Sequence, residues 1–364
     1  MGGTGGLRTC RPSRDGAVAY PGQRVIRLSL VELAATAADQ PQTDALESAL
    51  AAARHADQIG LHRVWFAEHH TTVGVSSHSP EILIAAASRE TQRIRLGSGA
   101  VLLNHHSSLR VAESFHQLQA MTPERVDLGL GRATAAPLID LALQRDRRSE
   151  PADDFDAQVA EILAYYHGGF FAEDHPFRQL RLPPSPANAP ETWILGSSGN
   201  SAGLAAALGL GYAFSAFINP HSAAAALRAY RDNFRPAAYG PEQPEAILSV
   251  NVAVADTDAE ARRLAWPFRA FWQQLGRVGF AAAAPRLAEA ERMLTDAQKE
   301  EPTVILDDRW PLQLAGSPST VRDELEKMIY ASGSTEIMIH DLITEHEARL
   351  HSHALLAEVL AVTP

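Results

Sequence analysis

A short apolar run in this chain stops on an acid and two histidines. The run covers Val64 to Ala67, and Glu68, His69 and His70 follow it directly. A β-branched and aromatic stretch of strand length that ends in titratable groups is typical of a buried strand carrying reactive side chains out of a core. Glutamate and histidine there can take up and release protons during a reaction. Because adjacent strand residues point to opposite faces, we expect only one of His69 and His70 to face the interior; the alternation alone does not choose between them.

A second group of residues that can do chemistry is the loop Gly196 to Ser201, which reads GSSGNS and runs into a predicted helix. Small residues let backbone N–H groups approach an anion, and a helix N-terminus adds partial positive charge. Ser197, Ser198 and Ser201 can donate hydroxyl hydrogen bonds to the same anion. The loop therefore indicates a phosphate cradle. The alternative is a flexible strand-to-helix connection with an N-cap serine.

A third group is Asp127 to Arg132, where two glycines precede an arginine at the predicted end of a strand. Arginine can bind phosphate through a forked pair of hydrogen bonds. The segment is not a dinucleotide fingerprint, because Thr134 stands where the third glycine would be. The alternative role for Arg132 is an ion pair with an acidic neighbour.

The chain has 15 histidines, so a zinc or di-metal site is the main alternative chemistry. The clustered histidines are His69, His70, His78, His105, His106, His351 and His353. Barrel hydrolases that use metals usually carry a His-x-His pair on their first strand, and the first predicted strand here has none. His351 and His353 fall on the last predicted helix, where we expect a solvated position. We therefore expect no metal.

The composition and net charge of the chain argue against several classes of protein. The 364 residues are 46% hydrophobic with a net charge of −11, which argues against binding to nucleic acid or an anionic membrane. No apolar stretch is long enough to span a bilayer. Cys10 is the single cysteine, so we expect no disulfide, no cysteine metal site and a cytoplasmic location. Residues 1–23 lack the features of a secretory signal and are predicted to be a disordered leader before one domain, residues 24–364.

The elements that must position these residues alternate between strands and helices, which predicts an α/β fold of the (β/α)8 barrel type. The predicted strands are Val25 to Val31, Arg63 to Glu68, Ile94 to Leu103, Val126 to Gly131, Thr192 to Gly196, Tyr212 to Phe217, Ile247 to Ala255 and Glu336 to Asp341. The predicted helices are Thr43 to Ile59, Pro80 to Thr91, Leu109 to Met121, Asp153 to Tyr166, Ser201 to Leu208, Ser222 to Phe234, Asp258 to Leu275, Ser319 to Ala331 and Glu345 to Leu360. Two long connections, Arg132 to Pro151 and Leu275 to Pro318, are predicted to be loops or insertions over the site, and Pro176 to Pro190 a stiff excursion.

Four motifs in this order resemble the bacterial luciferase-like monooxygenases. They are Ala67 to His70, then Leu96 to His105 leading to Arg110 to Glu113, then Asp127 to Arg132, then Gly196 to Ser201 with the helix end that follows it. The likeness runs from about residue 25 to the C-terminus. The order of the four motifs is more specific than any one of them.

The resemblance implies a barrel that binds FMN, reduced elsewhere to FMNH2 by a separate flavin reductase, or alternatively coenzyme F420. It implies that His69 acts as acid/base near the flavin, with Glu68 of the same motif as a second candidate catalytic residue, and that His70 is structural. Arg132 and the loop of Gly196, Ser197, Ser198 and Ser201 would bind the phosphate. Gly99 and Ala100, joined by a non-proline cis peptide, would lie under the flavin ring. Asn104, His105 and Asp341 fall at predicted strand ends and are candidates to face flavin or substrate; the alternative for each is a hydrogen-bonding group that orders a loop.

The same resemblance implies oxygen chemistry at C4a of the flavin, protected from water by an apolar wall of Trp65, Phe66, Val101 and Leu102 and by the loop 132–151. Gly131 stands where luciferases proper carry a cysteine, so light emission is not expected. The Gly-Thr-Asp continuation frequent in close relatives is also lacking after Arg132, so the phosphate pocket or its lid is expected to differ.

The partners and the substrate are the remaining expectations. We expect a homodimer through the second and third helices and no nucleic-acid or membrane partner. The alanine- and arginine-rich composition is typical of actinomycetes, where family members often tailor polyketides, so an aromatic polyketide is the predicted substrate; an aliphatic aldehyde or a sulfonate stays open. The alternatives for function are an F420- or FMN-dependent reductase or dehydrogenase, and a non-catalytic flavin-binding partner subunit.

Overall fold

The computed structural model of this chain describes residues 26–37, 39–132, 137–144, 148, 154–185, 188–279 and 282–360. Eight parallel strands form a closed barrel: β1 Arg27–Glu32, β2 Arg63–Phe66, β3 Arg95–Ser98, β5 Val126–Gly131, β6 Glu191–Gly196, β7 Gly211–Ser215, β8 Ala246–Val254 and β10 Glu336–His340. The barrel closes because β10 pairs with β1 on one side and with β8 on the other. Two short strands extend it, β4 Val101–Leu102 beside β5 and β9 Leu314–Gly316 beside β8. The predicted (β/α)8 barrel is confirmed. The predicted leader, residues 1–23, lies outside the described residues.

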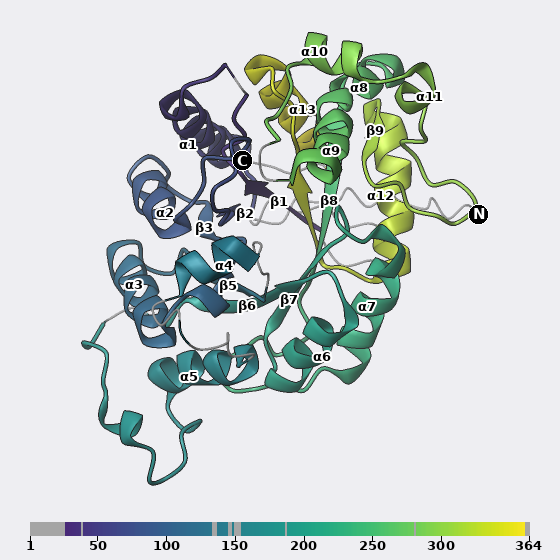
Figure 1. Cartoon of the computed structure of the whole chain (residues 1–364). Helices are drawn as coiled ribbons and strands as arrows, with labels where there is room; N and C mark the ends of the chain where they lie inside the picture. Colours follow the sequence, from purple (N-terminus) through teal and green to yellow (C-terminus); the bar gives the residue numbers. More distant parts are fainter. Residues whose placement is uncertain are drawn as a thin grey trace, which may run out of the picture.

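Helices surround the barrel on its outer side (Figure 1). They are α1 Gln42–Gln58, α2 Pro80–Ser88, α3 Ser108–Met121, α4 Pro137–Leu143, α5 Phe155–His167, α6 Gly199–Leu208, α7 Pro220–Asn233, α8 Asp258–Leu264, α9 Trp266–Val278, α10 Leu287–Met293, α11 Asp296–Lys299, α12 Pro318–Ser332 and α13 His346–Val359, with 3-10 turns η1 Leu103–His105 and η2 Pro176–Gln179. None of the described helices is long and apolar enough to cross a membrane. The predicted excursion contains η2 and extends away from the barrel, at the lower left of Figure 1.

Two predicted helix boundaries were wrong. The helix predicted from Asp258 to Leu275 is two helices, because Pro267 has no N–H to donate and α9 starts afresh beside it. The insertion predicted up to Pro318 contains α10, α11 and β9, and the described part of the insertion predicted after Arg132 contains α4. Ser201 does not open its helix: α6 begins at Gly199, and Ser201 lies in its first turn.

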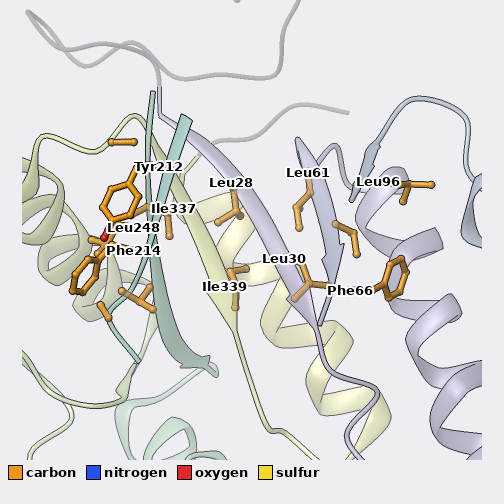
Figure 2. Close-up of a cluster of buried hydrophobic side chains, with 14 of the residues drawn as sticks. Leu28, Leu30, Leu61, Phe66, Leu96, Tyr212, Phe214, Leu248, Ile337 and Ile339 are labelled. Carbon is orange, nitrogen blue, oxygen red and sulfur yellow. The ribbon is translucent and has the colours of Figure 1, made fainter. Parts of the chain in front are cut away.

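Alternation along the strands separates two apolar layers. One layer lies between barrel and helices; Figure 2 shows its members Leu28, Leu30, Ile337 and Ile339 on neighbouring strands. The other layer fills the barrel interior and contains Val31, Leu33, Trp65, Ala67, Val75, Trp193, Ala213, Ile247 and Met338. Phe66 and Val101 belong to the first layer, so the prediction that they wall the site was wrong.

The N-terminal end of the barrel interior is closed by charged side chains. Arg63 is fully buried and donates to Asp127 at 2.7 Å and to Glu336 at 2.9 Å. Its guanidinium lies 4.7 Å from the ring centroid of Trp193. Arg95 donates to the other oxygen of Asp127 at 2.9 Å. The buried cation and its buried anions therefore neutralise one another below the apolar layer.

The seam where the first and last strands meet is held by a second buried charge cluster. Arg349 of α13 donates to Glu32 on β1 at 2.8 Å and to Asp341, just after β10, at 2.7 Å. His353 Nε2 lies 2.7 Å from the second oxygen of Asp341. Burial by itself raises the pKa of Asp341, but Arg349 and His353 hold it well below its usual range. Asp341 is thus a seam residue, and His353 is buried rather than solvated as predicted.

Candidate active site

A cavity of about 610 Å³ opens at the end of the barrel where the strands finish. A volume of this size suits a cofactor or a drug-sized ligand. Its lining includes most of the predicted site residues: Glu68, His69, Gly99, Ala100, Arg132, Gly196, Ser197, Ser198 and Ser201. Apolar side chains such as Leu33, Leu195 and Phe217 form much of the remaining wall. The strand ends therefore bring together residues that are far apart in the sequence.

The backbone that carries His69 is fixed from one side by the loop after it. The amide of His69 donates to the carbonyl of Ser77 at 2.9 Å, and His78 Nδ1 lies 2.7 Å from the carbonyl of His69. The Ser77 hydroxyl donates to the carbonyl of Ala67 at 2.5 Å. These bonds continue the strand direction past the end of β2, so His69 keeps the parity of Trp65 and Ala67 and faces the cavity.

His69 is a neutral imidazole in this position. Burial, with the nearby His70 and His78, lowers its pKa to about 4, against the opposing charge of Glu68. Its Nδ1 is buried and makes no hydrogen bond to any described residue. A neutral histidine with an unused ring nitrogen accepts a proton more readily than it donates one at neutral pH.

Glu68 forms hydrogen bonds to a backbone amide and to two histidines other than His69. One carboxylate oxygen lies 2.7 Å from His70 Nε2 and 2.8 Å from His106 Nε2. The other accepts a hydrogen bond from the amide of Leu102 at 2.9 Å. Burial by itself raises the pKa of Glu68, but His106, the Leu102 amide and His70 together lower it. His70 is not among the residues that line the cavity, and Glu68 ties the segment after β2 to β4. The catalytic role expected for Glu68 stays a prediction.

The opposite end of the cavity has the features of an anion site. Arg132 lies just past β5, and α6 begins beside it. Within the described residues, Ser198 makes no side-chain cap to the first turn of α6, which leaves those amides available to a ligand. The Ser201 hydroxyl donates to the carbonyl of Ser198 at 3.0 Å and so orders the loop. A Cβ on Gly196 would lie 2.1 Å from that hydroxyl oxygen, so only glycine fits there.

Between these two ends lies the bend after β3. The Gly99–Ala100 peptide is cis, as the resemblance implies, and both residues line the cavity. A Cβ on Gly99 would lie 3.0 Å from the Cβ of Trp65 and would crowd the ring beneath the cavity floor. Backbone with little side chain therefore forms this part of the cavity wall.

Three predicted site residues do not line the cavity. Asn104 and His105 lie on η1, where His105 Nε2 is 3.3 Å from a carboxylate oxygen of Asp140 on α4. Asp341 is committed to the seam. Sequence reasoning missed His340, which lines the cavity and shares its parity with the interior residue Met338. Within the described parts of the chain, no three His, Cys, Asp or Glu side chains gather in a way that could hold a metal ion.

Comparison with known proteins agrees with this geometry. The sequence model described as luciferase-like monooxygenase matches residues 27–352. The chain belongs to the luciferase-like monooxygenase family. The chain is therefore an oxidoreductase, built on the barrel common to that family.

Individual relatives of this luciferase-like monooxygenase match over nearly the whole chain. The Escherichia coli K12 protein named luciferase-like monooxygenase is 33% identical over 336 residues, 92% of this chain and 97% of that protein. The crystal structure of apo-MsnO8 is 37% identical, covers 93% of this chain and 99% of its own, and has a TM-score of 0.82. A shorter match, 40% identical over 103 residues (27% of this chain, 28% of the relative), is the 4-hydroxyprotoasukamycin monooxygenase of Streptomyces nodosus subsp. asukaensis.

Proposed function

We propose that this chain oxygenates a small, largely apolar organic molecule with molecular oxygen and reduced FMN, which a separate flavin reductase supplies. One observation carries the proposal: a single cavity has an anion site at one end and a neutral histidine at the other. Reduced flavin, when bound, supplies the electrons that activate oxygen. The cavity can hold such a group, because the uncapped start of α6 suits a phosphate and a volume of about 610 Å³ has room for the rest of the cofactor.

The side chains then have separate tasks. Arg132 and the amides at the start of α6 bind the phosphate and fix the depth of the cofactor. Leu33, Leu195 and Phe217 exclude water from the reacting end. His69 enters the reaction neutral and accepts a proton from the substrate or from a bound water molecule. Glu68 keeps β2 and β4 in register beside it.

The substrate we propose is a flat aromatic compound of the polyketide type. The apolar part of the cavity wall supports this choice, since it offers contact area to an uncharged ring system. The partial match to the 4-hydroxyprotoasukamycin monooxygenase, a relative named for a hydroxylated organic substrate, supports it further.

Oxygen labelling tests the proposed function directly. The chain is incubated with chemically reduced FMN, a panel of aromatic polyketide substrates and ¹⁸O₂, and the products are weighed by mass spectrometry. We expect the incorporation of one labelled oxygen atom. Turnover of the same panel without oxygen, with FMN or with F420, would instead identify a reductase or dehydrogenase and contradict the proposal. Absence of turnover alongside tight flavin binding would favour a non-catalytic partner subunit.

A further inference from the structure

His340 is a second histidine of the cavity, and its ring is fixed on two sides. It ends β10 and is 6% exposed. The ring stacks on Phe217 with centroids 4.2 Å apart and an interplanar angle of 12°. Phe268 of α9 packs against it edge-on at 5.9 Å. The imidazole therefore has a single orientation toward the cavity that it lines.

A neighbouring amide selects the tautomer of this ring. Asn251 lies opposite His340 on β8, and its Nδ2 is 2.8 Å from His340 Nδ1. With the amide nitrogen facing the ring, Asn251 donates and His340 Nδ1 accepts with its lone pair. Burial lowers the pKa of His340 to about 4, so the ring is neutral at pH 7. A neutral imidazole whose Nδ1 is an acceptor carries its proton on Nε2.

The Nε2–H group of His340 is left without a partner among the described residues. It stands in a wall formed by apolar residues such as Val31, Leu33 and Ile218. Arg132, the cationic side chain among the described lining residues, follows β5, which is not a neighbour of β10 in the barrel. An uncharged, pre-oriented donor in an apolar wall matches an uncharged acceptor, because an anion would need compensating charge.

We propose that His340 is a binding residue whose Nε2–H donates to a neutral carbonyl oxygen in the cavity. The carbonyl belongs either to the flavin ring or to the substrate, and this choice of sources rests on the proposed function. Asn251 is the positioning residue, since it decides which ring nitrogen carries the proton. The proposal adds to the site a specificity for carbonyl-bearing ligands that the phosphate end and His69 do not provide.

The tautomer is tested first, on the wild-type chain without cofactor. ¹⁵N NMR of the histidine-labelled protein at pH 7 is expected to show His340 as the Nε2–H tautomer, with the signal assigned by its loss in His340→Phe. A protonated Nδ1 would overturn the proposal. This measurement does not depend on turnover, so it stands even where the oxygen-labelling experiment fails.

The acceptor is tested by two binding arms in the wild type, His340→Phe and His340→Gln. One arm measures FMN affinity; the other compares 2-acetylnaphthalene with 2-ethylnaphthalene, which has the same ring system but no carbonyl. Loss of one hydrogen bond weakens binding by about threefold to tenfold. We expect His340→Phe to weaken either FMN or the acetyl probe by that factor, with partial recovery in His340→Gln, which keeps an N–H donor.

The outcomes separate the two sources. Weaker FMN binding assigns the donor to the flavin carbonyl, whereas loss of the preference for the acetyl over the ethyl probe assigns it to the substrate. If His340→Phe binds both FMN and the acetyl probe as tightly as wild type does, the proposal is overturned. It is also overturned if wild type does not prefer the acetyl probe over the ethyl probe and FMN affinity does not change in the variant. His351→Phe is the matched control, because the side chain of His351 is 53% exposed on α13, outside the cavity lining. It is expected to change neither affinity.

Discussion

The two ends of the barrel interior use polar side chains in opposite ways. At the N-terminal end, Arg63, Asp127 and Glu336 are buried, charged and bonded to one another. At the C-terminal end, His69 and His340 are buried and neutral, and each keeps a ring nitrogen without a partner among the described residues. Charges that neutralise each other hold the strands in place, whereas unused hydrogen-bonding groups are free to bind a ligand. One barrel thus has an end that stabilises it and an end that reacts.

Substitution of His69, at the C-terminal end, is expected to change activity most while changing stability little. His69→Asn removes the proton acceptor, so oxygen-dependent product formation should fall by about 10²- to 10⁴-fold. The midpoint of thermal unfolding should stay within a few degrees of wild type, because the lost side chain has an unsatisfied buried nitrogen. Steady-state assays and calorimetry check both values, with His351→Asn as the control. Unchanged product formation would show that His69 is not the acid/base group.

Arg63 is expected to give the reverse pattern. Arg63→Met leaves Asp127 and Glu336 buried without their cation, so the free energy of unfolding should fall by about 3–5 kcal/mol. Activity per folded molecule should be retained, because the apolar layer around Trp193 separates Arg63 from the cavity. Urea unfolding and an assay at low temperature measure the two quantities. If Arg63→Met is as stable as wild type, the charges at the N-terminal end do not stabilise the barrel as described.

Variants of Arg132 test the anion site at the C-terminal end of the barrel. Arg132→Ala removes a charged donor from the anion site and should weaken FMN binding by about 10- to 100-fold. Arg132→Lys keeps the charge but not the forked geometry, so its loss should be smaller. Fluorescence titration of FMN and of riboflavin, which lacks the phosphate, distinguishes the cause. Equal losses for both ligands would argue against a phosphate contact.

The smallest expected effect is a change in the pH dependence of stability. His69 and His340 stay neutral in the fold down to about pH 4, whereas unfolded histidine takes up a proton near pH 6.5. Between these values the unfolded chain binds more protons, so stability is full above about pH 6.5 and falls as the pH drops toward 4. His340→Asn should reduce this slope by up to about one proton. Urea titrations from pH 7 to pH 4.5 measure it; an unchanged slope would show that His340 is already protonated in the fold.

The sequence predicted the barrel well because alternating apolar runs mark strand positions. Val126–Gly131 matches its predicted strand at both ends, and the other seven barrel strands overlap theirs. The alternation fails where both faces of a strand are apolar. In β10, Ile337 and Ile339 face the helices while Met338 faces the interior. Because both sets are apolar, the sequence pattern does not show which residues of this strand face the interior.

That ambiguity explains why the sequence did not select His340, which lines the cavity. Asp341, one residue later, was expected either to face a ligand or to order its loop through hydrogen bonds; the second alternative holds, because it accepts hydrogen bonds from the amide of Ile343 and from Arg349. A shift of one residue moves a side chain to the opposite face of a strand. The partner that fixes Asp341 is Arg349, eight residues later on a separate helix, and no local pattern indicates that contact. Glu336 is a buried charge four residues before His340, so the two side chains point to the same face of β10. Counting in steps of two from Glu336 would have selected His340.

The seam cluster sets a condition on the order in which the chain can complete its fold. Glu32 on the first strand and Asp341 after the last meet on the guanidinium of Arg349, more than 300 residues downstream of Glu32. During synthesis the early strands leave the ribosome long before the residue that neutralises Glu32 exists. A chain that stops before α13 would keep the pairing of β10 with β1 but would leave Glu32 and Asp341 buried without their cation. Synthesis of α13, rather than of any one strand, is therefore the step that supplies the charge on which this seam depends.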